Sequence, residues 1–443
     1  MSADTIVIVG AGQAGGWAAT TLRDRGFDGR VILLGDEPHA PYERPPLSKA
    51  VLGGQAPAES TELFSAQRLA ELDIAFHPGI AATRLRLADR QVETSDGASI
   101  SYAKLILCMG GRPVVPPLPG VDSPGVHVLR TRDDALRLRA RLGPDRHVVI
   151  VGGGWIGLEV AATARQAGSR VTVLEQAPRL CARSVQPGVS AHLAALHGAH
   201  GVDLRLGASL LAIHALPDGR PVAELANGTR LTADAVVLGV GLAANDALAR
   251  EAGIACDRGV RVDAHCRTSA PDVYAAGDVA VSTHPATGDA MRLESWQNAQ
   301  DQGMAAALAA LGESAPYAPT GAVWSEQYGA MVQIVGFPAL AQCEVLRPQA
   351  DRRMLLSVSL DAAGRAVAGV AVDAPRELRQ LRKWIAQGAV LDPALVQRPD
   401  VPLASARSDD ENDGSHLPAS ARGQGRLRSR RADVFSRAGH PPP

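Results

Sequence analysis

The sequence predicts an α/β fold in which two similar β-α-β units come first and a smaller α+β domain follows. Two observations lead to this prediction. A strand, a glycine-rich turn and a helix occur in the same order near residue 10 and again near residue 152. Beyond residue 320, apolar and polar residues alternate in short runs that are typical of antiparallel strands. At roughly 150 residues per domain, the 443 residues suggest about three domains.

The first β-α-β unit begins with an apolar strand at residues 6–9 and continues into Gly10-Ala-Gly12-Gln-Ala-Gly15, a helix at 16–25 and a second strand at 30–34. Glycines at this spacing let the pyrophosphate of a dinucleotide approach the backbone, and N–H groups at the helix start bind the anion. An acid beyond the second strand accepts a hydrogen bond from a ribose hydroxyl. The candidate dinucleotide-binding residues here are Gly10, Gly12, Ala14, Gly15, Asp36 and Glu37.

The second unit repeats the pattern with a strand at residues 147–151, the turn Gly152-Gly-Gly154-Trp-Ile-Gly157, a helix through residue 167 and a strand at 170–174. Two complete Rossmann-like units suggest FAD in one and a nicotinamide cofactor in the other. Glu175 would repel a 2′-phosphate, and only Arg179 nearby could compensate, so NADH is favoured over NADPH. The candidate residues of this site are Gly152, Gly154, Ile156, Gly157, Glu175 and Gly241.

Proline and glycine punctuate the rest of the chain. Residues 110–120 are predicted to link into the second unit, and residues 239–244, after a strand at 235–238, to lead out of it. Alternating runs at 331–335, 354–360 and 366–372, followed by a helix at 376–387, predict a small third domain. After residue 402 the composition becomes polar and arginine-rich, which predicts a disordered tail. The predicted boundaries are 1–113, 114–243, 244–319, 320–403 and 404–443.

Composition argues against several functions. The 45 Lys and Arg nearly balance 46 Asp and Glu, so the net charge of −1 offers no electrostatic footprint for nucleic acid or an anionic membrane. The five cysteines lack the spacings of a zinc site, an iron–sulfur cluster or a redox disulfide, so no metal centre is expected. No run reaches about 18 apolar residues and no basic leader precedes the first strand, so we expect a cytoplasmic protein.

Four segments carry a further signal: Pro41-Tyr-Glu-Arg-Pro-Pro-Leu-Ser-Lys49, residues 152–162, residues 268–278 ending in Gly277-Asp278, and Glu294-Ser-Trp-Gln-Asn-Ala-Gln300. Together they resemble the oxygenase-coupled NADH-dependent ferredoxin reductases, over about residues 6–403. The resemblance implies the fold of glutathione reductase, in which an NAD-binding domain interrupts the FAD-binding domain and a C-terminal α+β domain follows. One departure is Cys108-Met109-Gly110, where such enzymes usually have Ala-Thr-Gly.

Lys49 is one of only three lysines in a chain with 42 arginines. Reduced flavin carries developing negative charge that a nearby cation stabilises, and the resemblance implies that Lys49 lies beside the flavin ring. By the same resemblance Glu159 faces the nicotinamide, although it could equally be an ordinary acid near a helix N-terminus. No side-chain nucleophile is expected. The resemblance also implies that FAD contacts Arg44, Ala82, Arg130, Asp278 and Trp296.

These features favour an FAD-dependent reductase that passes electrons from NADH to an acidic 2Fe–2S ferredoxin, which in turn supplies an aromatic-ring-hydroxylating dioxygenase or a cytochrome P450. The alternatives are a rubredoxin reductase, a general NADH diaphorase, and an interaction flavoprotein that resembles apoptosis-inducing factor and binds nucleic acid through its tail. A monomer and a homodimer are both compatible with the sequence. One basic row at helical spacing is either a ferredoxin-docking face or a solvated helix face: Arg376, Arg379, Arg382 and Lys383.

Overall fold

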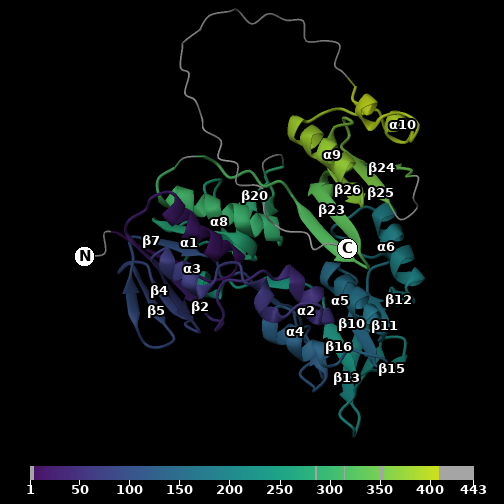
Figure 1. Cartoon of the computed structure of the whole chain (residues 1–443), viewed down its shortest axis with the longest axis horizontal. Helices are drawn as coiled ribbons and strands as arrows, with labels where there is room; N and C mark the ends of the chain where they lie inside the picture. The colour runs from purple at the N-terminus through teal and green to yellow at the C-terminus, as the bar shows by residue number, and fades with distance from the viewer. Residues whose placement is uncertain (1–3, 285–286, 314, 350–353, 409–443) are drawn as a thin grey trace, which may run out of the picture. The chain divides into compact units, whose positions relative to one another are not determined.

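The first sheet joins distant parts of the chain in the computed structural model, which describes residues 4–284, 287–313, 315–349 and 354–408 (Figure 1). Its five parallel strands lie in the order β19, β7, β1, β2, β3. The central strand β1 is almost entirely buried, as expected for a parallel strand covered on both faces. The chain leaves this sheet after β7 and returns to it at β19. The bounds are Thr5–Val9 (β1), Arg30–Gly35 (β2), Ile74–Pro78 (β3), Lys104–Leu107 (β7) and Val273–Ala275 (β19).

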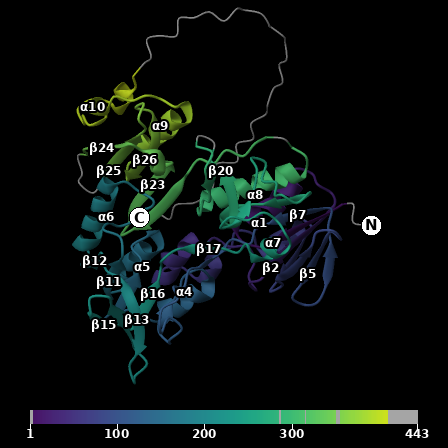
Figure 2. The same ribbon diagram turned by 180° about the vertical axis from the view of Figure 1, so that it is seen from behind.

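Two helices from opposite ends of this half pack together in both views (Figures 1 and 2): α1, Gln13–Asp24, and α8, Trp296–Ala310. Their contact is close because small residues face each other, and a Cβ on Gly303 would lie 2.4 Å from the Ala14 carbonyl oxygen. The other elements of this half are α2 (Ala50–Gly53), α3 (Ala66–Glu71), α7 (Ala247–Glu251), β4 (Ala82–Arg86), β5 (Gln91–Thr94), β6 (Ser99–Ser101), β18 (Val260–Arg261), β20 (Ala280–Thr283) and β21 (Ala290–Met291).

The second sheet is built like the first, with strands in the order β12, β11, β10, β16, β9. Its helix α5, Trp155–Gln166, follows the central strand β10 through the second glycine turn, as α1 follows β1. Both predicted β-α-β units are therefore present. The bounds are β9 (Val126–His127), β10 (His147–Val151), β11 (Arg170–Glu175), β12 (Asp203–Leu206), β16 (Ala235–Leu238), α4 (Arg132–Arg139) and α6 (Pro187–Ala199), with the antiparallel hairpin strands β13 (Leu210–Ala215), β14 (Pro221–Leu225) and β15 (Arg230–Thr232) beside them.

The two crossings between these halves pair with each other. β8, Gly111–Pro113, leads out of the first half, and β17, Leu242–Ala244, leads back into it. They form a two-stranded antiparallel ladder in which Gly111 faces Ala244. Gly111 must stay small because a Cβ there would lie 2.7 Å from the Ala243 carbonyl oxygen. The predicted linker and return are thus tied together by hydrogen bonds. β17 is labelled in Figure 2, the view from behind.

A five-stranded antiparallel sheet in the order β22, β23, β26, β25, β24 forms the third part. Helix α9 covers it with the buried side chains of Leu378, Leu381 and Trp384. Three of its strands and this helix match the sequence prediction, whereas β22 and β24 were not predicted. The bounds are β22 (Val323–Gln327), β23 (Ala330–Gly336), β24 (Cys343–Arg347), β25 (Leu355–Leu360), β26 (Ala366–Val372), α9 (Pro375–Gln387) and α10 (Pro393–Val396).

The start of the predicted tail belongs to this third part. Residues 404–408 were expected to be disordered, yet Leu403–Ala406 form a short 3-10 helix and Ala406 is fully buried. The Ser408 amide also donates to the Val390 carbonyl oxygen over 3.0 Å. Composition missed this because a single small apolar residue suffices to anchor the segment. The rest of the predicted tail, residues 409–443, lies outside the described residues. Among the helices that the structure describes, none is long and apolar enough to span a membrane.

Candidate active site

One cavity of about 1230 Å³ extends from the first glycine turn to the second. Its walls come from both β-α-β units and from the start of β22 in the third part. The turns lie at the carboxyl ends of β1 and β10, which is where ligands bind in open parallel sheets. Most of the predicted site residues line it: Gly10, Gly12, Ala14, Asp36, Glu37, Arg44, Lys49, Arg130, Asp278, Trp296, Gly152, Gly154, Ile156, Glu159, Glu175 and Gly241.

The glycine turns have the geometry of phosphate cradles. Gly10 and Gly152 take φ values of +104° and +112°, which residues with a Cβ rarely adopt. At Gly12 and Gly154, by contrast, an added Cβ would meet no protein atom within 4 Å. These two glycines cap α1 and α5, neither helix has a side-chain cap, and neither has an acid in its first turn. Free N–H groups therefore face the cavity at both helix starts, which favours a bound anion.

Three of the predicted residues lie outside the cavity lining. Gly15 and Gly157 serve packing instead, since an added Cβ would lie 1.9 Å from the Gly10 carbonyl oxygen and 2.0 Å from that of Gly152, respectively. Their backbones thus hold each helix against its own turn. Ala82 begins β4, where it pairs with Thr94 in a separate three-stranded sheet. The segment just before Ala82 is hydrogen-bonded to the end of β2, since the Gly79 amide donates to the Glu37 carbonyl oxygen over 3.0 Å.

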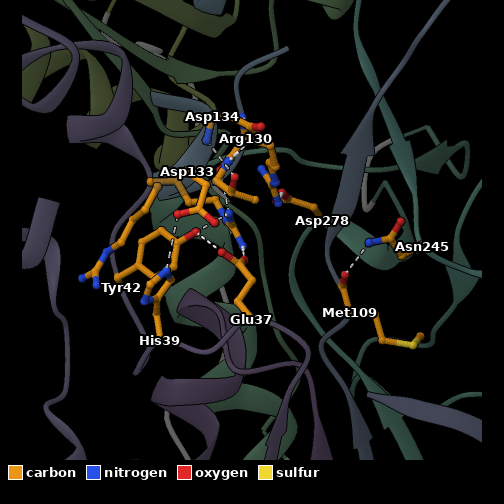
Figure 3. Close-up of polar contacts among 12 residues, drawn as sticks. Glu37, His39, Tyr42, Met109, Arg130, Asp133, Asp134, Asn245 and Asp278 are labelled. Atoms are coloured by element: carbon orange, nitrogen blue, oxygen red, sulfur yellow. Dashed lines mark hydrogen bonds and ion pairs between the residues drawn. The ribbon is translucent and has the colours of Figure 1, made fainter. Parts of the chain in front are cut away.

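The acid that follows β2 is held by a polar network (Figure 3). The Tyr42 hydroxyl donates to Glu37 Oε2 over 2.5 Å, and the Arg44 guanidinium pairs with Glu37 Oε1 at 2.8 Å. Burial raises the pKa of Tyr42, so its hydroxyl remains a donor. Arg44 also donates to the Arg130 carbonyl oxygen over 2.6 Å. Tyr42 is a site residue that the sequence analysis missed, although it lies within the segment from Pro41 to Lys49.

Arg130 and Asp278 meet across 148 residues of sequence. The guanidinium of Arg130 donates to Asp278 Oδ2 over 2.9 Å, as Figure 3 shows. Burial lowers the pKa of Arg130. Within the described residues its buried Nε has no hydrogen-bond partner, which leaves one donor for an acceptor bound in the cavity. Trp296, at the start of α8, donates from Nε1 to Glu43 Oε1 over 3.1 Å.

Lys49 and Glu159 form an ion pair, with 2.7 Å between Lys49 Nζ and Glu159 Oε2. The Glu159 side chain is 5% exposed and also accepts hydrogen bonds from Ser48 and Ser325. Because Glu159 lies beyond the first turn of α5, it is not an acid at the helix terminus. The two residues that the sequence singled out in separate units are therefore in direct contact.

Trp324 completes this part of the cavity from the third domain. The Lys49 ammonium lies 5.0 Å from the centre of its ring, and the residue is 36% exposed. A cation at this distance from an indole is attracted by the ring electrons. The sequence analysis missed Trp324, because the strand β22 that carries it was not predicted. The sequence offered no signal for it, since residues 323–327 show no apolar–polar alternation.

Glu175, which the sequence predicts to disfavour a 2′-phosphate, accepts hydrogen bonds from the backbone around it. Its carboxylate accepts from the Gly153 amide over 2.6 Å and from the Ala177 amide over 2.7 Å. The nearby Arg179 donates to the carbonyl oxygens of Val185 and Ala182 and to the Ser190 hydroxyl. The Arg179 guanidinium therefore points toward the segment from Ala182 to Ser190 and does not line the cavity.

All five cysteines lie in the described residues, and all are free thiols. Cys108 and Cys181 line the cavity, but burial raises the pKa of both thiols, that of Cys181 to about 12. The thiolate is the reactive form of cysteine, so neither is prepared for disulfide exchange near neutral pH. On α9, the basic row from Arg376 to Lys383 is exposed opposite the buried face, as both a docking face and a solvated helix face would be.

The fold and the cavity define the class of α/β proteins in which two Rossmann-like units open onto one shared cavity. Comparison with known proteins narrows this class. The model of the pyridine nucleotide-disulphide oxidoreductase family matches residues 4–303, and that of the reductase C-terminal domain matches residues 322–407. The chain belongs to the pyridine nucleotide-disulphide oxidoreductase family and carries the reductase C-terminal domain.

The chain is similar to reductase components of dioxygenase systems. It is 39% identical over 410 residues to the anthranilate 1,2-dioxygenase system ferredoxin–NAD(+) reductase component of Burkholderia cepacia, covering 91% of this chain and 99% of that protein. It is 38% identical over 392 residues to the 3-phenylpropionate/cinnamic acid dioxygenase ferredoxin–NAD(+) reductase component of Photorhabdus laumondii, covering 88% and 98%. The crystal structure of the covalent putidaredoxin reductase–putidaredoxin complex matches with a TM-score of 0.86 and 34% identity, over 92% and 99% of the two chains. The predicted fold class and family are confirmed.

Proposed function

We propose that this protein is an FAD-dependent reductase that passes electrons from NADH to a 2Fe–2S ferredoxin serving an aromatic-ring dioxygenase or a cytochrome P450. The observation that carries the proposal is the single cavity that joins both glycine turns and has the Lys49–Glu159 pair in its wall. Two dinucleotides that enter one cavity from opposite turns can bring their reactive rings together. The relatives that this chain resembles are named as ferredoxin–NAD(+) reductase components.

FAD fits the first turn. Gly10 and Gly12 let a ligand come close to the backbone. Asp36 and Glu37 follow β2, where ribose hydroxyls are bound in such units. The buried Nε of Arg130 has no partner among the described residues and can donate to a bound acceptor. When bound, the flavin takes up two electrons as hydride and releases them singly. Lys49 supplies a fixed positive charge for the negative charge that develops on reduction, and Glu159 holds that ammonium in place.

NADH fits the second turn, where Gly152 and Gly154 leave the helix start of α5 open. Glu175 places a carboxylate at the end of β11, where the 2′-phosphate of NADPH would lie, and like charges repel there. Arg179 gives little compensation, because its guanidinium is hydrogen-bonded to the segment from Ala182 to Ser190 and does not line the cavity. We therefore expect NADH to be used far better than NADPH.

The five cysteines are free and unreactive, so this chain has no thiol pair that could receive two electrons from the flavin. The electrons therefore leave to an external one-electron acceptor. The similarity to a reductase solved in covalent complex with putidaredoxin supports an iron–sulfur protein as that acceptor.

The experiment is to purify the full chain, reconstitute it with FAD, and follow the flavin absorbance while NADH is added without oxygen. The expected result is bleaching by NADH, followed by reduction of cytochrome c only when a 2Fe–2S ferredoxin is also present. Turnover with rubredoxin alone would favour the rubredoxin reductase alternative, and equal turnover with any dye but no carrier would favour a diaphorase. A colourless protein that leaves NADH unchanged would contradict the proposal.

A further inference from the structure

A row of buried polar groups leads away from Glu159 through the third domain to helix α6. Ser325 Oγ lies 2.6 Å from Glu159 Oε1, Gln327 Nε2 lies 3.0 Å from Ser325 Oγ, and His197 Nε2 lies 2.8 Å from Gln327 Oε1. The Tyr328 hydroxyl lies 3.3 Å from His197 Nδ1. We call these four residues, Ser325, Gln327, His197 and Tyr328, the β22 network.

Burying the polar side chains of the β22 network costs free energy unless they are hydrogen-bonded. Ser325 and Gln327 are each 1% exposed and His197 is 0% exposed. Ser325 and Gln327 stand on the inward face of β22, where an apolar residue would normally pack, because successive side chains of a strand alternate between faces. Polar side chains placed there must all be hydrogen-bonded to avoid a desolvation cost. In the β22 network each is.

The direction of every hydrogen bond follows from Glu159. A carboxylate only accepts, so the Ser325 hydroxyl donates to it, and Ser325 Oγ must then accept from the Gln327 amide nitrogen. This turns Gln327 Oε1 toward His197, whose Nε2 must carry the proton. Burial lowers the pKa of His197 to about 4, so near neutral pH its Nδ1 is an acceptor for the Tyr328 hydroxyl. All four donors point toward Glu159.

Tyr328, the member of the β22 network farthest from Glu159, has an unfavourable backbone conformation. Tyr328 takes a φ of +55° in the tight turn between β22 and β23, where glycine or asparagine is usual. Its ring stacks on the exposed His200 at 3.7 Å between centroids, and it meets His197 edge-on at 5.1 Å. Both histidines belong to the end of α6, so the turn is clamped to the NAD-binding half.

We propose that the β22 network positions the Glu159 carboxylate, and through it the Lys49 ammonium, for hydride transfer in the proposed active site. Glu159 Oε2 is taken by Lys49 and Ser48 from the first half, and Oε1 is taken by Ser325 from the third domain. One carboxylate on α5 thus ties together all three parts of the fold. The inference rests on the proposed function of the cavity. Its members are positioning residues, and the Gln327 amide in the middle carries no titratable proton.

The first test uses the full chain reconstituted with FAD, and measures single-turnover flavin reduction at increasing NADH in a stopped-flow instrument. Ser325→Ala removes the bond to Glu159 and is expected to lower the limiting rate about tenfold, while the NADH dissociation constant changes by less than about twofold. Ser325→Thr keeps the hydroxyl and should restore most of the rate. The matched control is Ser357→Ala, because the equally buried Ser357 donates to Glu344 in the same sheet but outside the β22 network.

A second readout needs neither FAD nor NADH. In the wild-type chain with ¹⁵N-labelled histidine, His197 should give the NMR signature of a neutral ring protonated at Nε2, with its signal assigned through His197→Gln. Ser325→Ala should shift that signal, and Ser357→Ala should leave it in place. The proposal is overturned if Ser325→Ala slows flavin reduction no more than Ser357→Ala, if it weakens NADH binding without changing the limiting rate, or if His197 is protonated at Nδ1. Failure to reduce ferredoxin would instead overturn the proposed function, since neither readout involves ferredoxin.

Discussion

At the scale of single residues, Lys49 is set apart from the other charged groups by its surroundings. It pairs with a buried carboxylate, faces the Trp324 ring and lines the cavity that both glycine turns share. A fixed ammonium there lowers the free energy of negative charge that develops beside it, and it does so most strongly where water is excluded. The charge, rather than the bulk of the side chain, is therefore the property to test.

Lys49→Met removes the charge and keeps most of the volume. We expect the rate of flavin reduction by NADH to fall by about tenfold or more, because stabilisation of the developing charge is lost. The rate is measured by stopped flow without oxygen. Lys104→Met is the control, since Lys104 also forms an ion pair, with Asp272, but does not line the cavity. Equal rates in the two variants would contradict the role of Lys49.

His197 predicts a pH dependence of stability. Burial holds its pKa at about 4 in the folded protein, against 6.5 for an ordinary histidine. Between these values the unfolded chain binds the proton more readily, so the free energy of unfolding decreases as pH falls from about 6.5 toward 4. For this residue, the loss of stability between neutral pH and a pH below the folded pKa is on the order of 3 kcal/mol.

The prediction is checked by denaturant unfolding at pH 7 and at pH 5 in wild type and in His197→Gln. The buried His147 and the half-buried His192 also have lowered pKa values and contribute to the total slope. The difference between the two proteins isolates His197. We expect a smaller loss of stability on acidification in the variant, and an unchanged slope would show that His197 is not the group responsible.

At the scale of elements, the two glycine turns contain glycines of two kinds, those that the fold requires and those that only a bound ligand would require. Gly10 and Gly15 are required by the protein itself, because a Cβ at either position would collide with a backbone oxygen. Gly12 and Gly154 are not, because they face open space. Their smallness has a purpose only if something else comes close to the backbone at those positions, namely the phosphates of a bound dinucleotide.

The Gly12→Ala and Gly154→Ala variants should therefore both fold, but each should bind a different cofactor poorly. Neither change meets a protein atom, so thermal midpoints of the cofactor-free chains should stay within a few degrees of wild type. Gly12→Ala should retain FAD poorly, as measured by the flavin content after gel filtration. Gly154→Ala should retain FAD but raise the KM for NADH by about tenfold or more. Loss of FAD from the Gly154 variant would contradict the assignment of the turns.

Part of this architecture could be predicted from sequence, because the patterns that reveal it lie within short stretches of the chain. Each β-α-β unit spans about thirty residues with glycines at fixed spacing, so both units, their acids and Lys49 were found from short segments. Strand β24 was missed because Cys343–Arg347 is short and shows no clear alternation. β22 was missed because Ser325 and Gln327 occupy its inward face, which reads as the polar face of a strand.

The contacts that complete the cavity are long-range. Ser325 and Glu159 are 166 residues apart, and Arg130 and Asp278 are 148 apart, so no spacing rule relates them. The sequence indicated that Glu159 matters but not that it pairs with Lys49. Only the packing of β22 against α5 brings the third part of the fold to that carboxylate. Ala82 is named only by the resemblance, and its pairing, within β4, with Thr94 neither supports nor excludes a contact with FAD.

At the scale of the whole molecule, the cavity and every residue that lines it belong to the compact unit of residues 1–408. The interaction-flavoprotein alternative places its function in the tail from Ser405 onward, which carries seven arginines against five acids. The two readings therefore assign function to different parts of one chain. Nearly balanced charge in the tail, as in the whole chain, gives little counterion release on nucleic acid.

A chain that ends at Ser408 separates these readings. We expect it to reduce ferredoxin with NADH at a rate within about twofold of the full chain, because it keeps both turns, the Lys49–Glu159 pair and the third domain. A twofold change in rate corresponds to about 0.4 kcal/mol in the activation barrier, which sets the tolerance of this comparison. The companion measurement is retention of the full chain on DNA at low and at physiological salt. Strong, salt-sensitive retention that disappears on truncation would move the function to the tail, whereas weak retention and an unchanged rate would place it in the cavity.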